Sequence, residues 1–141
     1  MERYLEPHER QLLEFILDVN APLYPDQSGR WKAQVERCTV HEVDVLHCLR
    51  ISHGGTALKP EGRSHTLRYE LVGLDEGVPV LIYVIIEETD DGFVLDTFSI
   101  DRLDGEPVVT YPEVGDRLMI VDGNRRVGGA DLRHVYGGSD S

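Results

Sequence analysis

Three extended apolar segments, joined by two short acidic connectors, constrain the fold of this 141-residue chain more than any other feature. The segments are His65–Gly73, Val78–Glu88 and Phe93–Asp101, and the connectors contain Asp75-Glu76-Gly77 and Thr89-Asp90-Asp91-Gly92. Both connectors end in glycine, which tight hairpin turns favour because glycine tolerates a positive φ. The pattern therefore predicts a three-strand antiparallel meander over residues 65–101.

The middle segment is apolar at successive positions from Val80 to Ile86, so both of its faces must be shielded from water. A strand of this kind at a sheet edge promotes aggregation, and we therefore expect it at the centre of the sheet, with a helix over one face. Upstream, apolar residues recur at helical spacing: Leu12, Leu13, Ile16 and Leu17. This predicts a helix that begins near Pro7, which suits a first helical turn, and ends near Asn20.

The remaining segments complete the predicted sheet. We interpret Pro22–Arg30 as a loop, Lys32–Val40 and Val43–Ser52 as strands, and 108–111 and Arg117–Val121 as edge strands or a final helical turn. The prediction is thus an α+β domain over residues 1–122, in which an N-terminal helix packs on a mainly antiparallel sheet of about five strands. Residues 123–141 are rich in glycine, and we expect a loose, mobile C-terminal segment there.

Charge limits the classes of partner. The chain has 26 acidic residues against 14 lysines and arginines, a formal net charge of −12, which repels nucleic-acid phosphates and anionic lipids. We therefore expect neither a nucleic-acid nor a membrane partner. The N-terminus lacks the pattern of a signal peptide, and two cysteines are too few for a disulfide framework, so a cytoplasmic location is expected.

The acidic residues are concentrated in the predicted meander. Between Glu70 and Glu106 there are eleven acidic residues against one arginine, or −10 over 37 residues. Such a concentration is consistent with solubility and protection of the sheet edges, with a surface for a basic partner, or with a divalent-cation site. The partner-binding hypothesis assigns these acidic residues to the contact: Asp75, Glu76, Glu87, Glu88, Asp90 and Asp91. It also assigns Trp31 and Tyr111 as exposed aromatic anchors.

Four residues of the types that bind zinc occur within eleven positions: Cys38, His41, His47 and Cys48. If the two predicted strands pair about Val43, Cys38 lies opposite Cys48 while His47 falls on the other face, so the donors do not converge. We therefore interpret the cysteines as buried apolar residues, with zinc or a disulfide as alternatives, and predict no metal and no cofactor.

Two further patterns suggest chemistry. Ser52-His53-Gly54-Gly55 is similar to the oxyanion loop of some esterases, but the chain has no Gly-x-Ser-x-Gly motif to supply the nucleophile. Asp96 alternates with apolar residues in the last strand of the meander. It either pairs with Arg68 or Arg50, or forms a site on the sheet face with Tyr83 and His65.

Three features resemble a family of small, uncharacterised bacterial cytosolic proteins that are similar to the immunity proteins encoded near toxins. They are Arg3-x-Leu5-x-x-x-Glu9 opening a helix, the Gly54-Gly55 pair after a strand, and the run Asp91–Asp101. The resemblance spans roughly residues 3–103 and supplies no catalytic residue. It implies a non-enzymatic, acidic protein-binding module, and specifically an immunity protein that occludes a basic toxin domain. The alternatives are a small enzyme or ligand-binding domain with a site around Asp96, and a homo-oligomeric structural module.

Overall fold

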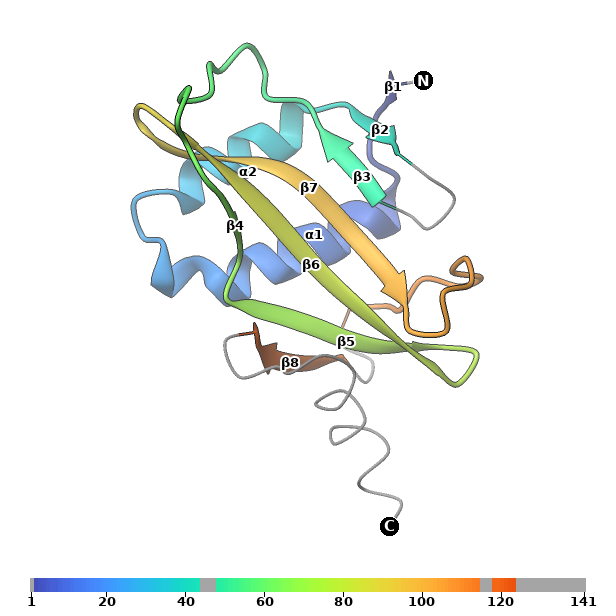
Figure 1. The fold of residues 1–141 in the computed structure, drawn as a ribbon. Helices are drawn as coiled ribbons and strands as arrows, with labels where there is room; N and C mark the ends of the chain where they lie inside the picture. Colours follow the sequence, from blue (N-terminus) through green and yellow to red (C-terminus); the bar gives the residue numbers. More distant parts are fainter. Residues whose placement is uncertain (1, 44–47, 115–117, 124–141) are drawn as a thin grey trace.

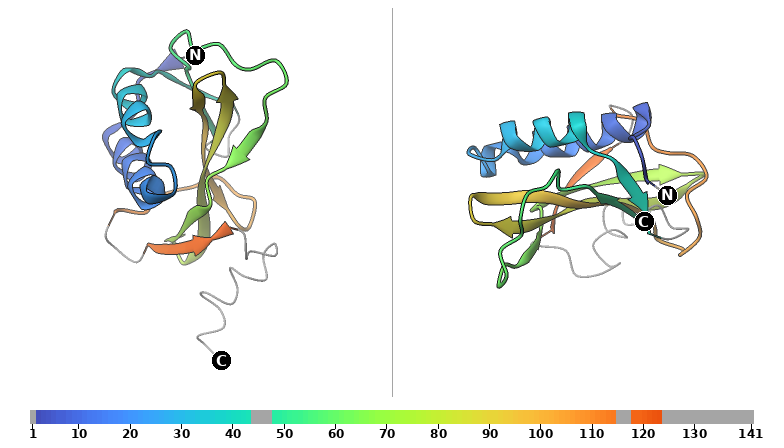
Figure 2. Two further views of the ribbon diagram at one scale, coloured as in Figure 1. Left: turned by 90° about the vertical axis from the view of Figure 1, so that its left-hand side faces the viewer. Right: turned by 90° about the horizontal axis from the view of Figure 1, so that it is seen from above.

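The chain folds into two layers, with two helices over one face of an antiparallel sheet (Figures 1 and 2). The computed structural model describes residues 2–43, 48–114 and 118–123. Helix α1 spans Pro7–Asn20 and α2 spans Ser28–Arg37, and a short 3-10 helix, η1 (Ala21–Leu23), lies between them. The predicted α+β class is confirmed, although the predicted number of helices and strands was too low.

The sheet has eight strands, in the order β1-β2-β3-β7-β6-β5-β8, with β4 pairing β6 outside this sequence of neighbours. Their bounds are β1 Glu2–Arg3, β2 Val40–Glu42, β3 Cys48–Ile51, β4 Ser64–Thr66, β5 Tyr69–Asp75, β6 Val78–Thr89, β7 Gly92–Arg102 and β8 Met119–Asp122. All pairings are antiparallel. Five of the eight strands have four residues or fewer, which explains why periodicity did not reveal all of them.

The predicted meander is confirmed as β5, β6 and β7, although its first segment, predicted over His65–Gly73, is divided between β4 and β5. Glu76 and Gly77 adopt φ values of 51° and 82°, so the β5–β6 connector is a tight turn with positive φ at both central positions. Strand β6 is central, because it pairs with β7 along its length and with β5 and β4 on its other side. Its Val80, Ile82 and Val84 side chains are fully buried beneath the helices.

The first helix was also predicted correctly. Its N-terminus is a capping box, in which the Glu9 carboxylate accepts the Glu6 backbone N–H at 2.8 Å. The Arg3 guanidinium binds both oxygens of Glu9, at 2.7 and 2.8 Å, and also contacts Glu42 at 2.9 Å. These contacts join α1 to β1 and β2. The apolar side of α1 forms the core with the sheet.

The second helix was missed. The predicted strand Lys32–Val40 is wrong over most of its length, and the predicted loop Pro22–Arg30 contains both η1 and the start of α2. Trp31 and Val35 lie four residues apart on the buried side of α2, and Cys38 follows three residues later. This spacing is typical of a helix. The same segment also shows an apparent alternation of apolar and polar residues, which is why a strand was predicted instead.

Other predictions are only partly confirmed. The predicted strand Val43–Ser52 corresponds to β3, while positions 44–47 lie outside the described residues. Residues 108–111 form no strand, whereas the edge strand predicted at Arg117–Val121 is confirmed as β8, Met119–Asp122. The C-terminal segment predicted from residue 123 lies, beyond Gly123 itself, outside the described residues. Within the described ranges, no helix is both long and apolar enough to cross a bilayer.

Candidate functional site

Side chains of α2 take the place of a neighbouring strand at the start of β7. Strand β3 pairs with β7 only at residues 97–99, so among the described residues no strand lies beside the edge of β7 before this point. The Gln27 side chain accepts the Phe93 N–H at 3.1 Å, and the Trp31 indole N–H donates to the Phe93 carbonyl at 3.1 Å. Gln34 accepts the Leu95 N–H and donates to the Leu95 carbonyl, both at 2.9 Å. These bonds fix α2 beside the sheet edge.

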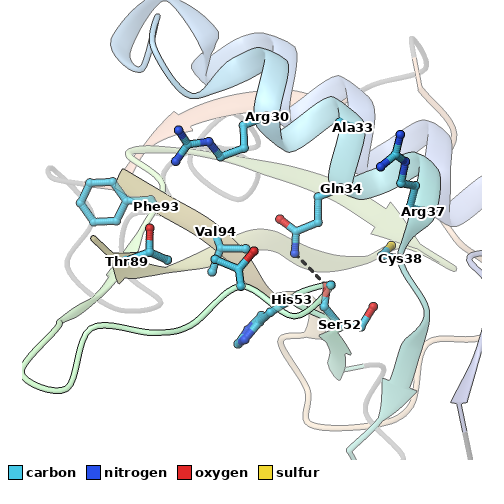
Figure 3. A pocket seen from close by; sticks show the side chains of 12 residues that line it. Arg30, Ala33, Gln34, Arg37, Cys38, Ser52, His53, Thr89, Phe93 and Val94 are labelled. Carbon is cyan, nitrogen blue, oxygen red and sulfur yellow. Dashed lines mark hydrogen bonds between the residues drawn. The ribbon is translucent and has the colours of Figure 1, made fainter. Parts of the chain in front are cut away.

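A cleft of about 210 Å³ opens between α2 and this part of the sheet; we call it the α2–β7 cleft (Figure 3). Its helix side comprises Arg30, Ala33, Gln34 and Arg37. Its strand side comprises Ser52, His53, Gly54 and Thr56, which follow β3, together with Thr89, Phe93 and Val94 around the β6–β7 turn. Gln34 donates across the cleft to the Ser52 carbonyl at 3.0 Å, which joins the two sides (Figure 3).

Arginines without carboxylate partners distinguish this cleft. Of the ten lysines and arginines in the described ranges, seven have a nitrogen within 4.0 Å of a carboxylate oxygen. The three without such a contact in that part of the chain are Arg30, Arg37 and Arg63. Arg30 and Arg37 both line the cleft, at positions two turns and about 10 Å apart along α2. In a chain with almost twice as many acidic as basic residues, such a grouping is a signal for an anionic ligand.

His53 and Asp96 form a hydrogen-bonded pair at the strand side. In the register of β6 and β7, Ile85 pairs with Thr97 and Ile86 pairs with Leu95. The bulge between these two pairs leaves Asp96 without a paired residue on β6. Its carboxylate contacts His53 Nε2 at 2.9 Å, accepts the Thr97 hydroxyl at 2.8 Å and lies 3.6 Å from Arg50. Of the two predicted arginine partners, Arg50 is therefore correct, whereas Arg68 pairs with Asp122 at 3.0 Å.

Tyr83 and His65, the other members of the predicted site around Asp96, lie elsewhere. The structure places Tyr83 beside Ser99 and Asp101, and burial raises the pKa of its hydroxyl. His65 packs edge-on against the Phe93 ring, with centroids 5.4 Å apart. Sequence reasoning found Asp96 and noted His53 separately. It missed their pairing, and it missed Arg30 and Arg37 because it did not predict α2.

Two of the residues predicted at a partner contact are buried, which corrects their expected exposure. The Asp75 side chain is completely inaccessible and lies 3.1 Å from Arg102. Burial alone would raise its pKa, but the Val109 and Thr110 N–H groups and Arg102 outweigh this and hold it below its ordinary value. Trp31 is likewise completely buried, because its ring packs into the core beneath α2. Neither residue is available to a partner in this structure.

The remaining predicted contact residues do not form one surface. Glu76 lies at the β5–β6 turn, whereas Glu87, Glu88, Asp90 and Asp91 lie at or near the β6–β7 turn. The two turns lie at opposite ends of β6, about 36 Å apart along the strand (Figure 1). Tyr111 is half-buried against the core, with its ring 4.2 Å from the His8 ring. The predicted single acidic patch is therefore wrong.

The described members of the alternative zinc set, Cys38, His41 and Cys48, do not form a metal site. The register pairs Val40 with Ile51, so Cys38 does not lie opposite Cys48 as predicted. Both cysteines are free thiols, which excludes the disulfide alternative; Cys38 is buried and Cys48 half-buried. Burial raises the pKa of the Cys38 thiol. His47 lies outside the described residues, and in the described ranges no group of three or more His, Cys, Asp or Glu side chains is arranged to hold a metal.

Comparisons with protein-family models, with curated proteins and with solved structures gave no match to this chain. The resemblance to immunity-type proteins therefore stays a prediction, and the functional argument depends on the geometry of the site.

Proposed function

We propose that this protein is a ligand-binding module whose α2–β7 cleft takes a small molecule with an anionic group. The observation that carries the proposal is that Arg30 and Arg37 line the cleft without a carboxylate partner in the described part of the chain. Guanidinium groups bind carboxylates and phosphates through charge-assisted hydrogen bonds. The alternative predicted from the sequence was also a ligand-binding domain, but it placed the site on the sheet face around Asp96, and Asp96 does not line this cleft.

The cleft also limits the rest of the ligand. Ala33, Phe93 and Val94 provide apolar surface between the polar groups. A volume of about 210 Å³ lies below the roughly 300–1,000 Å³ of pockets for drug-sized ligands, so the ligand is compact. A small ligand with a flat or short apolar part and a single carboxylate fits these properties. A larger polymer could bind only by inserting one of its ends or one side chain into the cleft.

The test is a calorimetric titration with two probes, benzoate and sulfate. Benzoate offers both an apolar ring and an anion, while sulfate offers only the anion. Arg37→Gln should weaken the binding of both probes about tenfold, since a hydrogen bond to a charged group contributes roughly 1.5–3 kcal/mol. Arg30→Gln should also weaken binding, but Arg37 is the cleaner site because Arg30 also donates to the Asp91 carbonyl at 2.8 Å.

Arg63→Gln is the matched control, because Arg63 is also an arginine without a carboxylate partner in the described ranges but lies outside the cleft. Its affinity for both probes should stay within twofold of the unmodified protein. Equal losses in the Arg37 and Arg63 variants would show that the probes respond to overall charge, and would overturn the proposal. So would the absence of measurable binding.

A second candidate is the protein-binding role that the resemblance implies. One observation favours it: Asp90 and Asp91 are exposed at the tip of the β6–β7 turn, next to the half-exposed Glu87 and Glu88. The test applies if a basic toxin domain is encoded beside this chain's gene, and it measures the association rate of the two proteins. The double change Asp90→Asn and Asp91→Asn should slow association, while Glu76→Gln, at the other end of β6, should not. Equal rates for both variants would argue against this role.

A further inference from the structure

His53 lies between two hollows. It lines the α2–β7 cleft, and it also lines a second hollow of about 210 Å³ beside Asp96 and Arg50. Its side chain is 23 % exposed, so water and small solutes reach it, whereas the Asp96 side chain is only 7 % exposed. Gly54 and Gly55, which follow His53, adopt φ values of 64° and 84°, and the Thr56 N–H returns to the His53 carbonyl at 3.2 Å. This turn leads the chain away from β3, and three of its residues, His53, Gly54 and Thr56, line the α2–β7 cleft.

The contact with Asp96 determines what His53 offers to a ligand. An ionised carboxylate only accepts hydrogen bonds, so Nε2 of His53 must carry the proton that joins them. In the neutral imidazole, Nδ1 then holds a lone pair and can only accept. An anion cannot bind to that lone pair. Protonation turns Nδ1 into a donor and adds a positive charge beside the cleft that Arg30 and Arg37 line.

The surrounding charges favour this protonation when an anion is present. The titratable and charged groups around His53 are Asp96 on β7, Arg50 on β3, Glu2 on β1, His41 on β2, and Arg30 and Arg37 on α2. An anion bound at Nδ1 adds a negative charge in direct contact with the imidazole, and an opposite charge at this distance favours the protonated form.

We propose that His53, held in position by Asp96, is a third anion-binding residue of the α2–β7 cleft, and that binding there is coupled to the uptake of one proton from solvent at Nδ1. This inference rests on the proposed function, because it concerns the same ligand. It adds that the affinity for an anion rises as the pH falls, because the protonated imidazole is the form that donates to the anion.

The experiment measures proton uptake directly. Benzoate and sulfate are titrated into the full chain at pH 6.5 in two buffers with different ionisation enthalpies, because the difference in observed heat gives the number of protons taken up. Neither probe changes its own charge near this pH. The unmodified protein should take up a substantial fraction of one proton for each anion bound, and its affinity should increase several-fold between pH 8 and pH 5.5.

Three variants locate the proton. His53→Gln should abolish the uptake and leave a weaker affinity that no longer depends on pH, and a thermal melt checks that it is folded. Asp96→Asn should reduce the uptake, because it removes the charge that stabilises the imidazolium. His41→Asn is the control, since His41 lines only the second hollow; it should take up protons like the unmodified protein.

The outcomes separate this inference from the function on which it rests. Anion binding that depends on Arg37 but takes up no proton would overturn the role of His53 and leave the ligand-binding proposal in place. Proton uptake that persists in the His53 variant would also overturn it. If neither probe binds at any pH, both proposals are wrong.

Discussion

At the scale of single residues, Asp75 illustrates how burial changes what a carboxylate does. Its two oxygens accept the backbone N–H groups of Val109 and Thr110, at 2.7 and 2.8 Å, and contact Arg102 at 3.1 Å. Burial raises the pKa of this carboxyl group, but the three donors outweigh burial and lower it on balance. The residue therefore anchors the segment after β7 to the β5–β6 turn.

The lowered pKa of Asp75 predicts a specific dependence of stability on pH. A carboxyl group with a lower pKa in the folded than in the unfolded state stabilises the fold above the unfolded value, about 3.9, and loses this effect as the pH falls through the folded value. Asp75→Asn should thus lower the free energy of unfolding at pH 7 by about 1–3 kcal/mol, and the difference should narrow below about pH 4. Urea denaturation at pH 7 and pH 3 measures both. The exposed neighbour Glu76, changed to Gln, should have little effect, and a deficit in the Asp75 variant that is constant with pH would contradict the assignment.

Gly92 is a second residue where backbone geometry leads to a prediction. Its φ is 133°, and a Cβ built there would lie 2.5 Å from Nε2 and 2.6 Å from Oε1 of Gln27, the side chain that accepts the Phe93 N–H. Gly77 also has a positive φ, 82°, but no atom within 4 Å of such a Cβ. Gly92→Ala should therefore destabilise the protein by about 1–3 kcal/mol more than Gly77→Ala.

A double-mutant cycle tests whether Gln27 is the cause. In a Gln27→Ala background the contact is absent, so the additional cost of Gly92→Ala should fall toward that of Gly77→Ala. Chemical denaturation of the single and double variants gives the coupling free energy. Additive effects of the two changes would show that backbone strain alone explains the need for glycine.

At the scale of secondary-structure elements, α2 acts as a cover for a sheet edge, and Gln34 is its central contact. Gln34→Leu keeps a similar size but leaves the N–H and C=O groups of Leu95 without their side-chain partner. We expect the free energy of unfolding to fall by about 2–4 kcal/mol, because each buried polar group left unpaired costs ~1–3 kcal/mol. Gln11→Leu on the exposed side of α1 is the matched control, and it should change stability little. A similar loss in both variants would contradict the role of Gln34.

The same contacts explain which elements could be predicted from the sequence. The meander was predictable because its connectors are short and its strands are long, so turn chemistry and hydrophobicity agree. Helix α2 was not, because it buries only Trp31 and Val35. Its other inward contacts come from Gln27 and Gln34, polar residues whose bonding partners on β7 lie more than sixty positions away in the sequence. The pattern of hydrophobic residues in a sequence does not indicate such contacts.

At the scale of the whole molecule, the separation of the acidic residues could be predicted from the sequence, whereas the cleft could not. Successive turns of a meander lie at alternate ends of the sheet, so the predicted meander already implied that Glu76 and Asp90 are separated by the length of β6. The cleft, in contrast, combines α2, the segment after β3 and the β6–β7 turn. No local pattern relates Arg37 to His53, because only the packing of α2 against β7 brings them to one site.

The sheet topology also predicts an order of local opening. Strand β6 has ten paired positions with β7, five with β5 and three with β4, whereas β1 has two and β8 has four. The amide hydrogens of β6 and the adjoining half of β7 should therefore exchange most slowly, close to the rate set by global unfolding, and those of β1 and β8 much faster. Native-state hydrogen exchange followed by NMR measures this order directly.

The predicted order of opening can be tested most directly at the edge of β7 that α2 covers. The Phe93 and Leu95 amides are bonded to side chains of a helix rather than to a strand, so their protection reports whether α2 opens with the sheet or before it. Because Gln34→Leu lowers global stability, the β6 amides should also exchange faster, but we expect the acceleration at Leu95 to be larger than theirs. If α2 instead opens only with the whole sheet, Leu95 and the β6 amides will accelerate by the same factor, and access to the cleft will not depend on local movement of the helix.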